Sequence, residues 1–298
     1  MIDTLPRAAD QAQAAPTDRR RAGPPLPRRL LANQAAAIGL AIVALYLLLA
    51  IVAPLLPLRD PMQMGGARPM SGPSWAMPLG ADTFGRDLLS RIVFGARLSL
   101  QVAVESVAVA LLIGSFLGLV AGYAGGWFDQ LSMRTMDVLF AFPAVLLALG
   151  VVAALGPSPT NVVIAIAIVY TPIFARVVRG PVLALKEREF VEAARALGAR
   201  ASRIIVRHVV PNVLSVLIVQ TSIALSWAVL TEASLSFLGL SAQPPAPSWG
   251  VMLNEGRQNL ELAPHMAIFP GVAIMLAVLG FNLLGDGLRD VLDPRLRR

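Results

Sequence analysis

The sequence holds few residues that could carry out catalysis. Cysteine is absent, and the two histidines, His208 and His265, lie too far apart in the sequence to suggest a metal pair. The only lysine, Lys186, is followed by Glu187, so the phosphate-binding motif G-x4-G-K-[ST] does not occur. No Ser/His/Asp set or carboxylate pair is spaced for hydrolysis. We therefore predict no catalytic residue, no metal site and no cofactor, and a chain that is not an enzyme.

One polar segment, residues 186–197 (KEREFVEAARAL), has a pattern that predicts docking. It consists of good helix formers, and Gly198 follows at the position where a left-handed residue commonly ends a helix. An apolar stripe with helical spacing is formed by Phe190, Ala193, Ala194 and Leu197. A helix this short is marginal alone, so we expect it to dock on another surface. The alternative is that the segment only supplies the arginines that orient a membrane protein.

The residue types around this stripe suit a docking surface. The small side chains of Ala193 and Ala194 would let another backbone approach closely, and Glu192 would supply polar contacts or order the helix. A second short amphipathic stretch, 202–209, leads to Pro211. Proline suits the first turn of a helix, so Pro211 marks the start of the next apolar segment.

Two carboxylates, Glu105 and Glu232, lie beside long apolar runs. An ionisable residue inside a membrane is a functional candidate by default. The second apolar run can cross a membrane over 107–124, which leaves Glu105 at the outer interface, and Glu232 follows the end of the fifth run. We expect both residues at the outer interface; the alternative is that they line an outer vestibule.

The elements that must position these residues are membrane-spanning helices. Of the 298 residues, 56% are hydrophobic and 14% are charged, whereas a soluble domain carries about 25% charged residues. This composition excludes an ordinary water-soluble enzyme. A transmembrane helix needs about 20 apolar residues, because lipid offers no partner for an unpaired backbone group. We predict six spans, over residues 35–56, 106–128, 138–155, 161–178, 209–231 and 262–285.

Two further segments lie outside these spans. Residues 82–97 predict an external amphipathic helix along the membrane, with Asp87 and Arg91 paired on its polar face. This helix would be an interfacial elbow before the second span, or alternatively a contact for a substrate-delivery protein. Residues 233–254 are uncharged but are interrupted by the run Pro244-Pro245-Ala246-Pro247, so they form an external loop or a re-entrant segment.

The basic residues predict the orientation. Nineteen of the 25 Lys and Arg residues fall on one side of the six spans, in residues 1–34, at Arg134, in 176–210 and in 285–298. Because Lys and Arg resist translocation, both termini and the docking segment are predicted to be cytoplasmic. The tail over 1–34 is expected to be uncleaved and largely disordered. It lacks interleaved aromatic residues, so no nucleic-acid partner is expected.

The docking segment resembles a motif of a known family. Glu192-Ala193-Ala194-x3-Gly198-x9-His208-x-Val210-Pro211 is similar to the E-A-A-x3-G-x9-I-x-L-P loop of ABC importer permeases, with His208 and Val210 replacing Ile and Leu. Five other segments resemble the second, C-type permease subunit of the dipeptide/oligopeptide/nickel importer subfamily. They are Leu79–Arg97, Met136–Pro143, Glu232–Gly239, Gln243–Gly250 and Phe281–Leu296. The resemblance runs from about residue 28 to residue 298.

The resemblance implies an all-α integral membrane protein with six transmembrane helices and the type I ABC importer (MetI-like) permease fold. The permease core would be residues 98–285, with the EAA loop at 184–211. Residues 35–97 would form the first helix and an external segment, and 286–298 a cytoplasmic tail. The implied function is a permease subunit for peptides in the bacterial inner membrane, and its EAA loop would form the coupling helix that contacts a separate ATPase subunit.

The resemblance also implies partners. These are a sister permease forming a heterodimer, two ATP-binding subunits that hydrolyse ATP, an extracytoplasmic solute-binding protein, and membrane lipid. One alternative function is an ABC importer permease for nickel or another small solute. An alternative from a different class is a secondary transporter that uses an ion gradient.

Overall fold

A computed structural model describes residues 26–292, and over this part of the chain the regular structure is helical. The longer helices are α2 (Gln34–Val52), α3 (Leu88–Ala124), α4 (Gly126–Phe140), α5 (Ala144–Leu155), α6 (Pro159–Lys186), α9 (Val210–Phe237) and α11 (His265–Leu292). The shorter ones are α1 (Leu26–Ala32), η1 (Ala53–Leu55), α7 (Glu189–Ala196), α8 (Ala201–Ile204), η2 (Ile205–Val209) and α10 (Trp249–Gln258).

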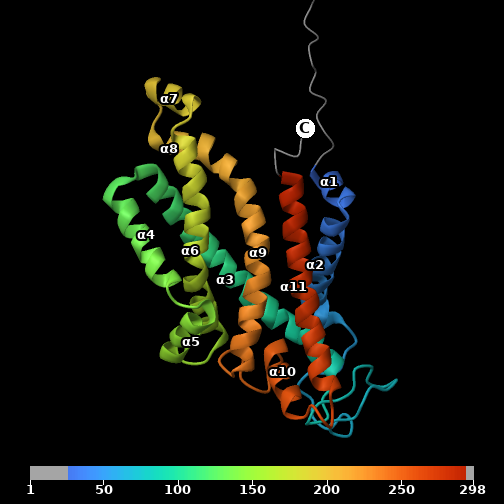
Figure 1. The fold of residues 1–298 in the computed structure, drawn as a ribbon. Coiled ribbons are helices and arrows are strands. Elements are labelled where there is room, and N and C mark those ends of the chain that lie inside the picture. Colours follow the sequence, from blue (N-terminus) through green and yellow to red (C-terminus); the bar gives the residue numbers. More distant parts are fainter. Residues whose placement is uncertain (1–25, 293–298) are drawn as a thin grey trace, which may run out of the picture.

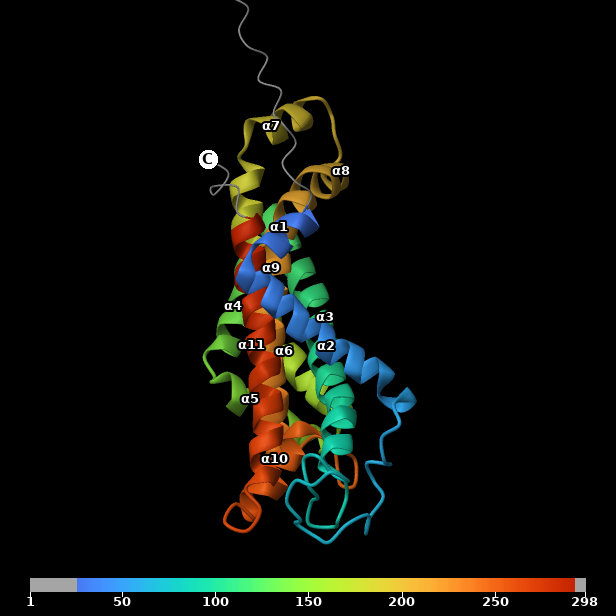
Figure 2. The same ribbon diagram turned by 90° about the vertical axis from the view of Figure 1, so that its right-hand side faces the viewer.

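These helices form an elongated bundle with two different ends (Figures 1 and 2). One end carries α7 and α8, together with α1 and the last turns of α11, and we name it the α7 end. The opposite end carries α10 and the loop of residues 57–87, and we name it the α10 end. The polar segment that the sequence singled out therefore lies at the extremity of the bundle.

Five helices are long and apolar enough to cross a membrane, and the described residues contain a sixth crossing if the bent pair of α4 and α5 counts as one. The predicted spans over 35–56, 161–178, 209–231 and 262–285 fall on α2, α6, α9 and α11. The predicted third span over 138–155 is wrong as a single helix. The chain bends by 92° between α4 and α5, because Pro143 lacks a backbone N–H and disfavours a helical conformation at Phe142.

The expected separate interfacial helix over residues 82–97 is wrong, because most of this segment belongs to α3. Residues 82–87 are not helical, and from Leu88 the helix continues unbroken for 37 residues to Ala124. Asp87 does not pair with Arg91 across a polar face. Its carboxylate instead caps α3 by accepting a hydrogen bond from the Ser90 backbone N–H at 3.2 Å, and Arg91 is buried. The segment is therefore the first part of a long helix that continues through the predicted second span as far as Ala124. Residues 126–128, which were predicted to end that span, belong to α4 instead.

Three other expectations are refined by the structure. In the segment 233–254, α9 continues to Phe237, a proline-containing loop follows, and α10 begins at Trp249. At the N-terminus, residues 26–32 form α1 rather than disordered chain, and residues 1–25 lie outside the described residues. At the C-terminus, α11 extends through Leu292 into the predicted tail.

Helices α3 and α6 approach each other through glycines on α3. A Cβ atom at Gly114 would lie 2.5 Å from the carbonyl oxygen of Thr171, and one at Gly118 would collide with the carbonyl oxygen of Ala175. One turn further on, a Cβ at Gly122 would lie 3.0 Å from the Val182 side chain. Small residues at every fourth position bring helix backbones close together in membrane proteins, where van der Waals packing drives association.

Helix α2 packs on α11 in the same manner, and both views show the two helices side by side (Figures 1 and 2). A Cβ at Gly39 would collide with the backbone of Leu284, and a Cβ at Gly287 would collide with Ala36. At the α7 end the contact is completed by a hydrogen bond of 3.2 Å from Asn33 Nδ2 to Asp290 Oδ2.

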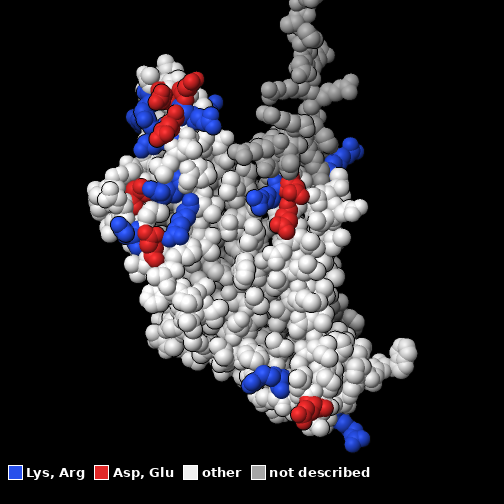
Figure 3. Space-filling view, in the orientation of Figure 1, with Lys and Arg blue, Asp and Glu red and all other residues white. Residues whose placement is uncertain are grey.

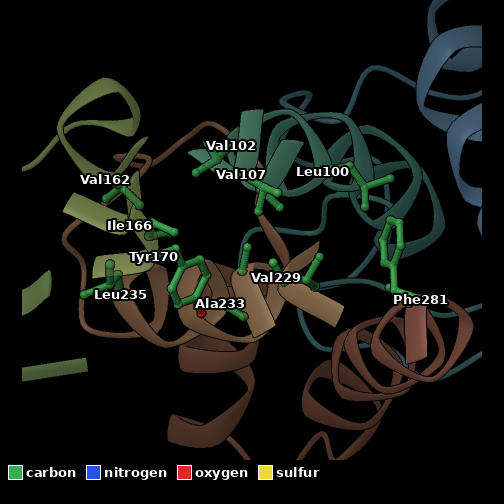
Figure 4. Close-up of a cluster of buried hydrophobic side chains, with 14 of the residues drawn as sticks. Leu100, Val102, Val107, Val162, Ile166, Tyr170, Val229, Ala233, Leu235 and Phe281 are labelled. Carbon is green, nitrogen blue, oxygen red and sulfur yellow. The ribbon is translucent and has the colours of Figure 1, made fainter. Parts of the chain in front are cut away.

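The main apolar core lies between α3, α6, α9 and α11 (Figure 4). It includes Val107 of α3, Ile166 of α6, Val229 of α9 and Phe281 of α11. Tyr170 reaches this core from α6, and its hydroxyl lies 2.9 Å from Thr231 Oγ1, so its polar atom is satisfied. On the face shown in Figure 3, a broad band without charged side chains separates the charges near the α7 end from those at the α10 end.

Candidate functional site

The candidate site is the loop between α6 and α9, at the α7 end. Helix α6 runs to Lys186, and α7 begins at Glu189 after a two-residue break, so the predicted helix over 186–197 starts three residues later than expected. Gly198 has φ +80° and ends α7. This confirms the predicted left-handed position, which a β-branched residue adopts only with strain.

One face of α7 is buried against the bundle. Val191 is fully buried in an apolar cluster with Val178 and Val182 of α6 and with Val209, and Ala194 packs against its edge. The cluster also contains Ile204 and Val213. Part of the docking surface predicted for this helix is therefore supplied within the chain, by α6 and the start of α9. Val191 does not belong to the predicted stripe. It is buried because it contacts α6, and the sequence of α7 alone does not reveal that contact.

The opposite face of α7 presents apolar side chains to solvent. Phe190 is 46% exposed and Leu197 is 88% exposed, and Ala193 and Glu192 are exposed as well. The predicted stripe is therefore divided, with Ala194 turned toward the cluster and the other three members turned outward. Apolar side chains held outward on an ordered helix typify an interaction surface.

The connection into α9 contains a π-helical turn over Ile205–Val209. Pro211 stands in the first turn of α9, as predicted. Because Pro211 has no N–H to donate to the carbonyl of Arg207, the usual bonding pattern cannot continue there, and the wider turn accommodates the break. Nearby, the His208 carbonyl accepts a hydrogen bond of 2.6 Å from Asn212 Nδ2, and the His208 ring lies 5.8 Å from the ring of Phe190.

The two carboxylates predicted at the outer interface, Glu105 and Glu232, have different surroundings and are not brought together by the structure. Glu105 is exposed on α3, where its carboxylate accepts a hydrogen bond of 2.8 Å from Gln101 Nε2. Glu232 lies within α9 rather than beyond a span, and it is fully buried. One of its oxygens accepts a bond of 2.6 Å from Ser236 Oγ. In this conformation Glu232 therefore does not face an open vestibule.

The burial of Glu232 leads to a stability prediction. Replacing Glu232 with alanine leaves a cavity and an unpaired Ser236 hydroxyl, so we expect a loss of about 2 kcal/mol. The measurement is the thermal unfolding of the purified protein in detergent. Glu105→Ala removes the same side chain from an exposed site and is expected to change stability by less than about 0.5 kcal/mol. Equal midpoints for the two variants would contradict the structural role given to Glu232.

A buried charge network at the α10 end was not anticipated from the sequence. Arg91 is fully buried, with its guanidinium 3.3 Å from Asp82 Oδ2 and 3.6 Å from Glu255 Oε2. Its Nη1 atom also donates to the carbonyls of Pro61 and Pro245, at 3.3 Å each. Arg91 thus joins the loop of residues 57–87, the loop before α10, and α10 itself. The pairing of Asp82 with Arg86, at 2.5 Å, is the one part with a local signal, because they stand four residues apart.

These features define the class of the protein: a multi-pass membrane bundle that carries an ordered polar loop with apolar side chains at one extremity. Residues 110–298 match the family described as "Binding-protein-dependent transport system inner membrane component", and residues 27–69 match "N-terminal TM domain of oligopeptide transport permease C". The chain therefore belongs to the family of binding-protein-dependent transport permeases.

Individual relatives agree with this assignment. The chain is 49% identical over 270 residues to the dipeptide transport system permease protein DppC of Alkalihalophilus pseudofirmus, covering 91% of this chain and 89% of that protein. It is 54% identical over 226 residues to the glutathione transport system permease protein GsiD of Pectobacterium atrosepticum, covering 76% and 75%. The predicted resemblance to a C-type permease subunit of the peptide importer subfamily is confirmed.

Solved structures show the same fold. The inward-facing MetNI methionine ABC transporter aligns with a TM-score of 0.56 at 19% identity, over 68% of this chain and 97% of that chain. An amino acid ABC transporter crystallised with histidines gives 0.53 at 16% identity, over 66% and 92%. The predicted MetI-like permease fold is thereby confirmed.

The family assignment settles the coarse function. The protein is a permease subunit of an ABC importer and a multi-pass protein of the inner membrane. Like its relatives it is a transporter rather than an enzyme, and an importer permease of this kind works with ATPase and binding-protein partners. The alternative of a secondary transporter driven by an ion gradient is contradicted by the family.

Proposed function

We propose that this chain forms one half of a translocation pathway for di- and oligopeptides, together with a sister permease in a heterodimer. Two separate ATP-binding subunits would hydrolyse the ATP, and an extracytoplasmic binding protein would deliver the peptide. The observation that supports the peptide assignment is the high identity to relatives named for dipeptide and glutathione transport. Both of those cargoes are short peptides, so a pathway for peptides is the simplest common property.

The proposed contact with the ATPase is the exposed face of α7. Phe190, Ala193 and Leu197 would enter a groove on the ATPase subunit, with Glu192 making polar contacts beside them. The buried face, through Val191, would transmit movement of α7 to α6 and α9. Gly198 would form the turn after α7, and Pro211 would begin the helix that receives the movement.

The proposed orientation places the α7 end in the cytoplasm. Eight of the chain's Lys and Arg residues lie in 176–210, around α7, and positive side chains resist translocation. Both ends of the described chain, α1 and the last turn of α11, lie at the same end as α7 (Figure 1). We propose that ATP binding draws the two ATPase subunits together and that the α7 helices follow, which reorients the paired permeases between inward-open and outward-open states.

Uptake by the reconstituted complex tests the proposed cargo. The permease, its sister permease, the ATPase subunits and the binding protein would be assembled in proteoliposomes, and uptake of radiolabelled dialanine and glutathione would be followed with and without ATP. We expect ATP-dependent accumulation of at least one of them, with competition from unlabelled dipeptides. Accumulation of nickel ions without uptake of either peptide would contradict the proposal.

The turn at Gly198 gives a mutational test of the coupling role. Isoleucine at this φ is strained by about 1–2 kcal/mol, so we expect Gly198→Ile to displace the end of α7 and lower transport per ATP hydrolysed about fivefold. Asparagine tolerates the left-handed conformation, so Gly198→Asn should remain close to the unaltered protein. Uptake and ATPase rate are measured together, and immunoblots of the membranes check insertion. Equal coupling ratios in the two variants would count against α7 as the coupling helix.

A further inference from the structure

Helix α4 is attached to the bundle mainly by charged side chains. Over its fifteen residues only Met136 is buried, so apolar packing does little to fix its position. Two arginines of α6 pair with its two aspartates instead. Arg179 forms a bidentate pair with Asp129, at 2.6 Å from Nε and 2.7 Å from Nη2. We name this contact, with the pair described next, the α4–α6 charge pairs.

The second pair lies eight residues further along α4 and three residues earlier on α6. Arg176 Nη2 is 2.7 Å from Asp137 Oδ1, and its guanidinium carbon lies 4.0 Å from the centre of the Phe140 ring. Arg176 therefore holds the last turn of α4, directly before the bend at Pro143. The two pairs are eight residues apart on α4, so together they fix both the position and the rotation of that helix on α6.

The two pairs are not equivalent. The side chains of Arg176 and Asp137 are 44% and 52% exposed, and an exposed ion pair contributes little by itself. Arg179 and Asp129 are 33% and 13% exposed, and their bidentate geometry gives orientation as well as attraction. The Arg179–Asp129 pair is therefore the principal link between α4 and α6. The contacts of Arg176 help to orient the last turn of α4.

The charge pairs lie between the α7 surface and the bend in the membrane bundle. On α6 they occupy the half nearest α7, and Lys186 at the end of α6 is separated from α7 by two residues. From the pairs, α4 leads to the 92° bend and then to α5, which lies toward the α10 end (Figure 1). In Figure 3 a group of acidic and basic side chains lies over the parts of α4 and α6 nearest α7, between the charges around α7 and the uncharged band.

We propose that Arg179 and Asp129, assisted by Arg176 and Asp137, are positioning residues that transmit movement of α7 through α6 to the bent α4–α5 segment. This inference rests on the proposed function, in which α7 follows the ATPase subunits. A displacement of α7 moves α6, because the two are joined by a short break and share the buried cluster around Val191. The charge pairs then carry α4 with α6, and the bend converts the movement of α4 into a movement of α5.

The absence of cysteine from the chain provides a clean reporter for this movement. Val145 lies in the first turn of α5 and is exposed, so Val145→Cys introduces a single thiol just past the bend. In the reconstituted complex, the rate of labelling by a water-soluble maleimide would be measured with and without ATP plus vanadate. We expect ATP to change the labelling rate. We expect Asp129→Arg or Arg179→Asp to reduce that ATP-dependent change about tenfold, because each substitution removes the interaction between residues of one charge network. The exchange Asp129→Arg with Arg179→Asp should restore most of it.

Further variants separate the possible outcomes. Arg134→Gln neutralises an exposed arginine on α4 and should leave the ATP response intact, whereas Arg179→Gln should reduce it. An ATP response that survives Asp129→Arg and Arg179→Asp, in complexes assembled to normal levels, overturns the inference and leaves the proposed function standing. A response that survives Gly198→Ile but is lost with the charge pairs overturns the proposed coupling through α7 instead. If the single variants fail to assemble, the ATP response of the double variant Asp129→Arg with Arg179→Asp is the test. A double variant that assembles but shows no restored ATP response also overturns the inference.

Discussion

Replacing Arg91 with methionine is expected to destabilise the protein by about 3 kcal/mol or more. Arg91 is fully buried and lies between the carboxylates of Asp82 and Glu255 while donating to two backbone carbonyls. Methionine fills similar space but leaves these acceptors in a buried site without their cation, and breaking a buried charge pair typically costs about 3–5 kcal/mol. Because Arg86 still pairs with Asp82, we expect a value near the lower end of that range.

The matched control for this prediction is Arg97→Met. Arg97 lies on the same helix but is exposed, and no carboxylate lies within ion-pair distance of it in the part of the chain that the structure describes. The free energies of unfolding would be compared in detergent, together with the rate at which protease cuts the loop of residues 57–87. We expect faster cleavage only for Arg91→Met. Similar stability and cleavage in both variants would mean that Arg91 does not hold the loop in place.

The second large effect is expected from Gly118→Leu. A Cβ atom at Gly118 collides with the backbone carbonyl of Ala175, which cannot move aside as a side chain does. The change must push α3 and α6 apart along their whole contact, including the neighbouring contacts at Gly114 and Gly122. Overpacking a well-packed core typically costs about 1–3 kcal/mol, and a clash with backbone belongs at the upper limit. We expect a loss of about 3 kcal/mol and reduced amounts of protein in the membrane.

Gly180→Leu provides the comparison. Gly180 is also in a long helix, α6, but a Cβ there would meet no atom within 4 Å. Thermal unfolding in detergent and immunoblots of membranes would be measured for both variants. Gly180→Leu should resemble the unaltered protein in both measurements. A normal melting temperature for Gly118→Leu would show that α3 and α6 are not packed as closely as the structure indicates.

The spans could be predicted from the sequence wherever one long apolar run corresponds to one helix. Helices α2, α6, α9 and α11 meet this condition, because the cost of an unpaired backbone group in lipid decides their structure almost alone. The third span could not be predicted as well. Pro143 is present in the sequence, but proline is also tolerated inside membrane helices, so the sequence did not decide between a continuous span and the 92° bend.

The candidate site could be located but not resolved in detail. The helical spacing of Phe190, Ala193 and Leu197 correctly indicated an apolar face, and Gly198 correctly indicated the end of α7. Whether a given face of α7 is turned inward depends on α6 and α9, which contribute Val182 and Val213 to the buried cluster. Such contacts between distant segments leave no local pattern in a single sequence.

The charge network at the α10 end was hidden for the same reason. Arg91 and Glu255 are far apart in the chain, and their contact depends on how α10 lies against α3. An arginine in an amphipathic helix ordinarily faces water, so the local pattern placed Arg91 on a polar face. A helical wheel for residues 82–97 therefore cannot distinguish an exposed arginine from a buried arginine that is paired with a carboxylate distant in the sequence.

The unbroken course of α3 connects the two extremities of the permease mechanically. At about 1.5 Å per residue, its 37 residues form a rod about 55 Å long, which exceeds the roughly 30 Å thickness of the lipid hydrocarbon. One end of this rod holds the buried Arg91, and the other rests on α6 near α7. A change in the tilt of α3 at one extremity therefore moves its other end as well. In the proposed complex, if nucleotide and the cargo-delivery protein each favour one tilt, thermodynamic reciprocity requires nucleotide to change the affinity for that protein by the same factor by which that protein changes the affinity for nucleotide.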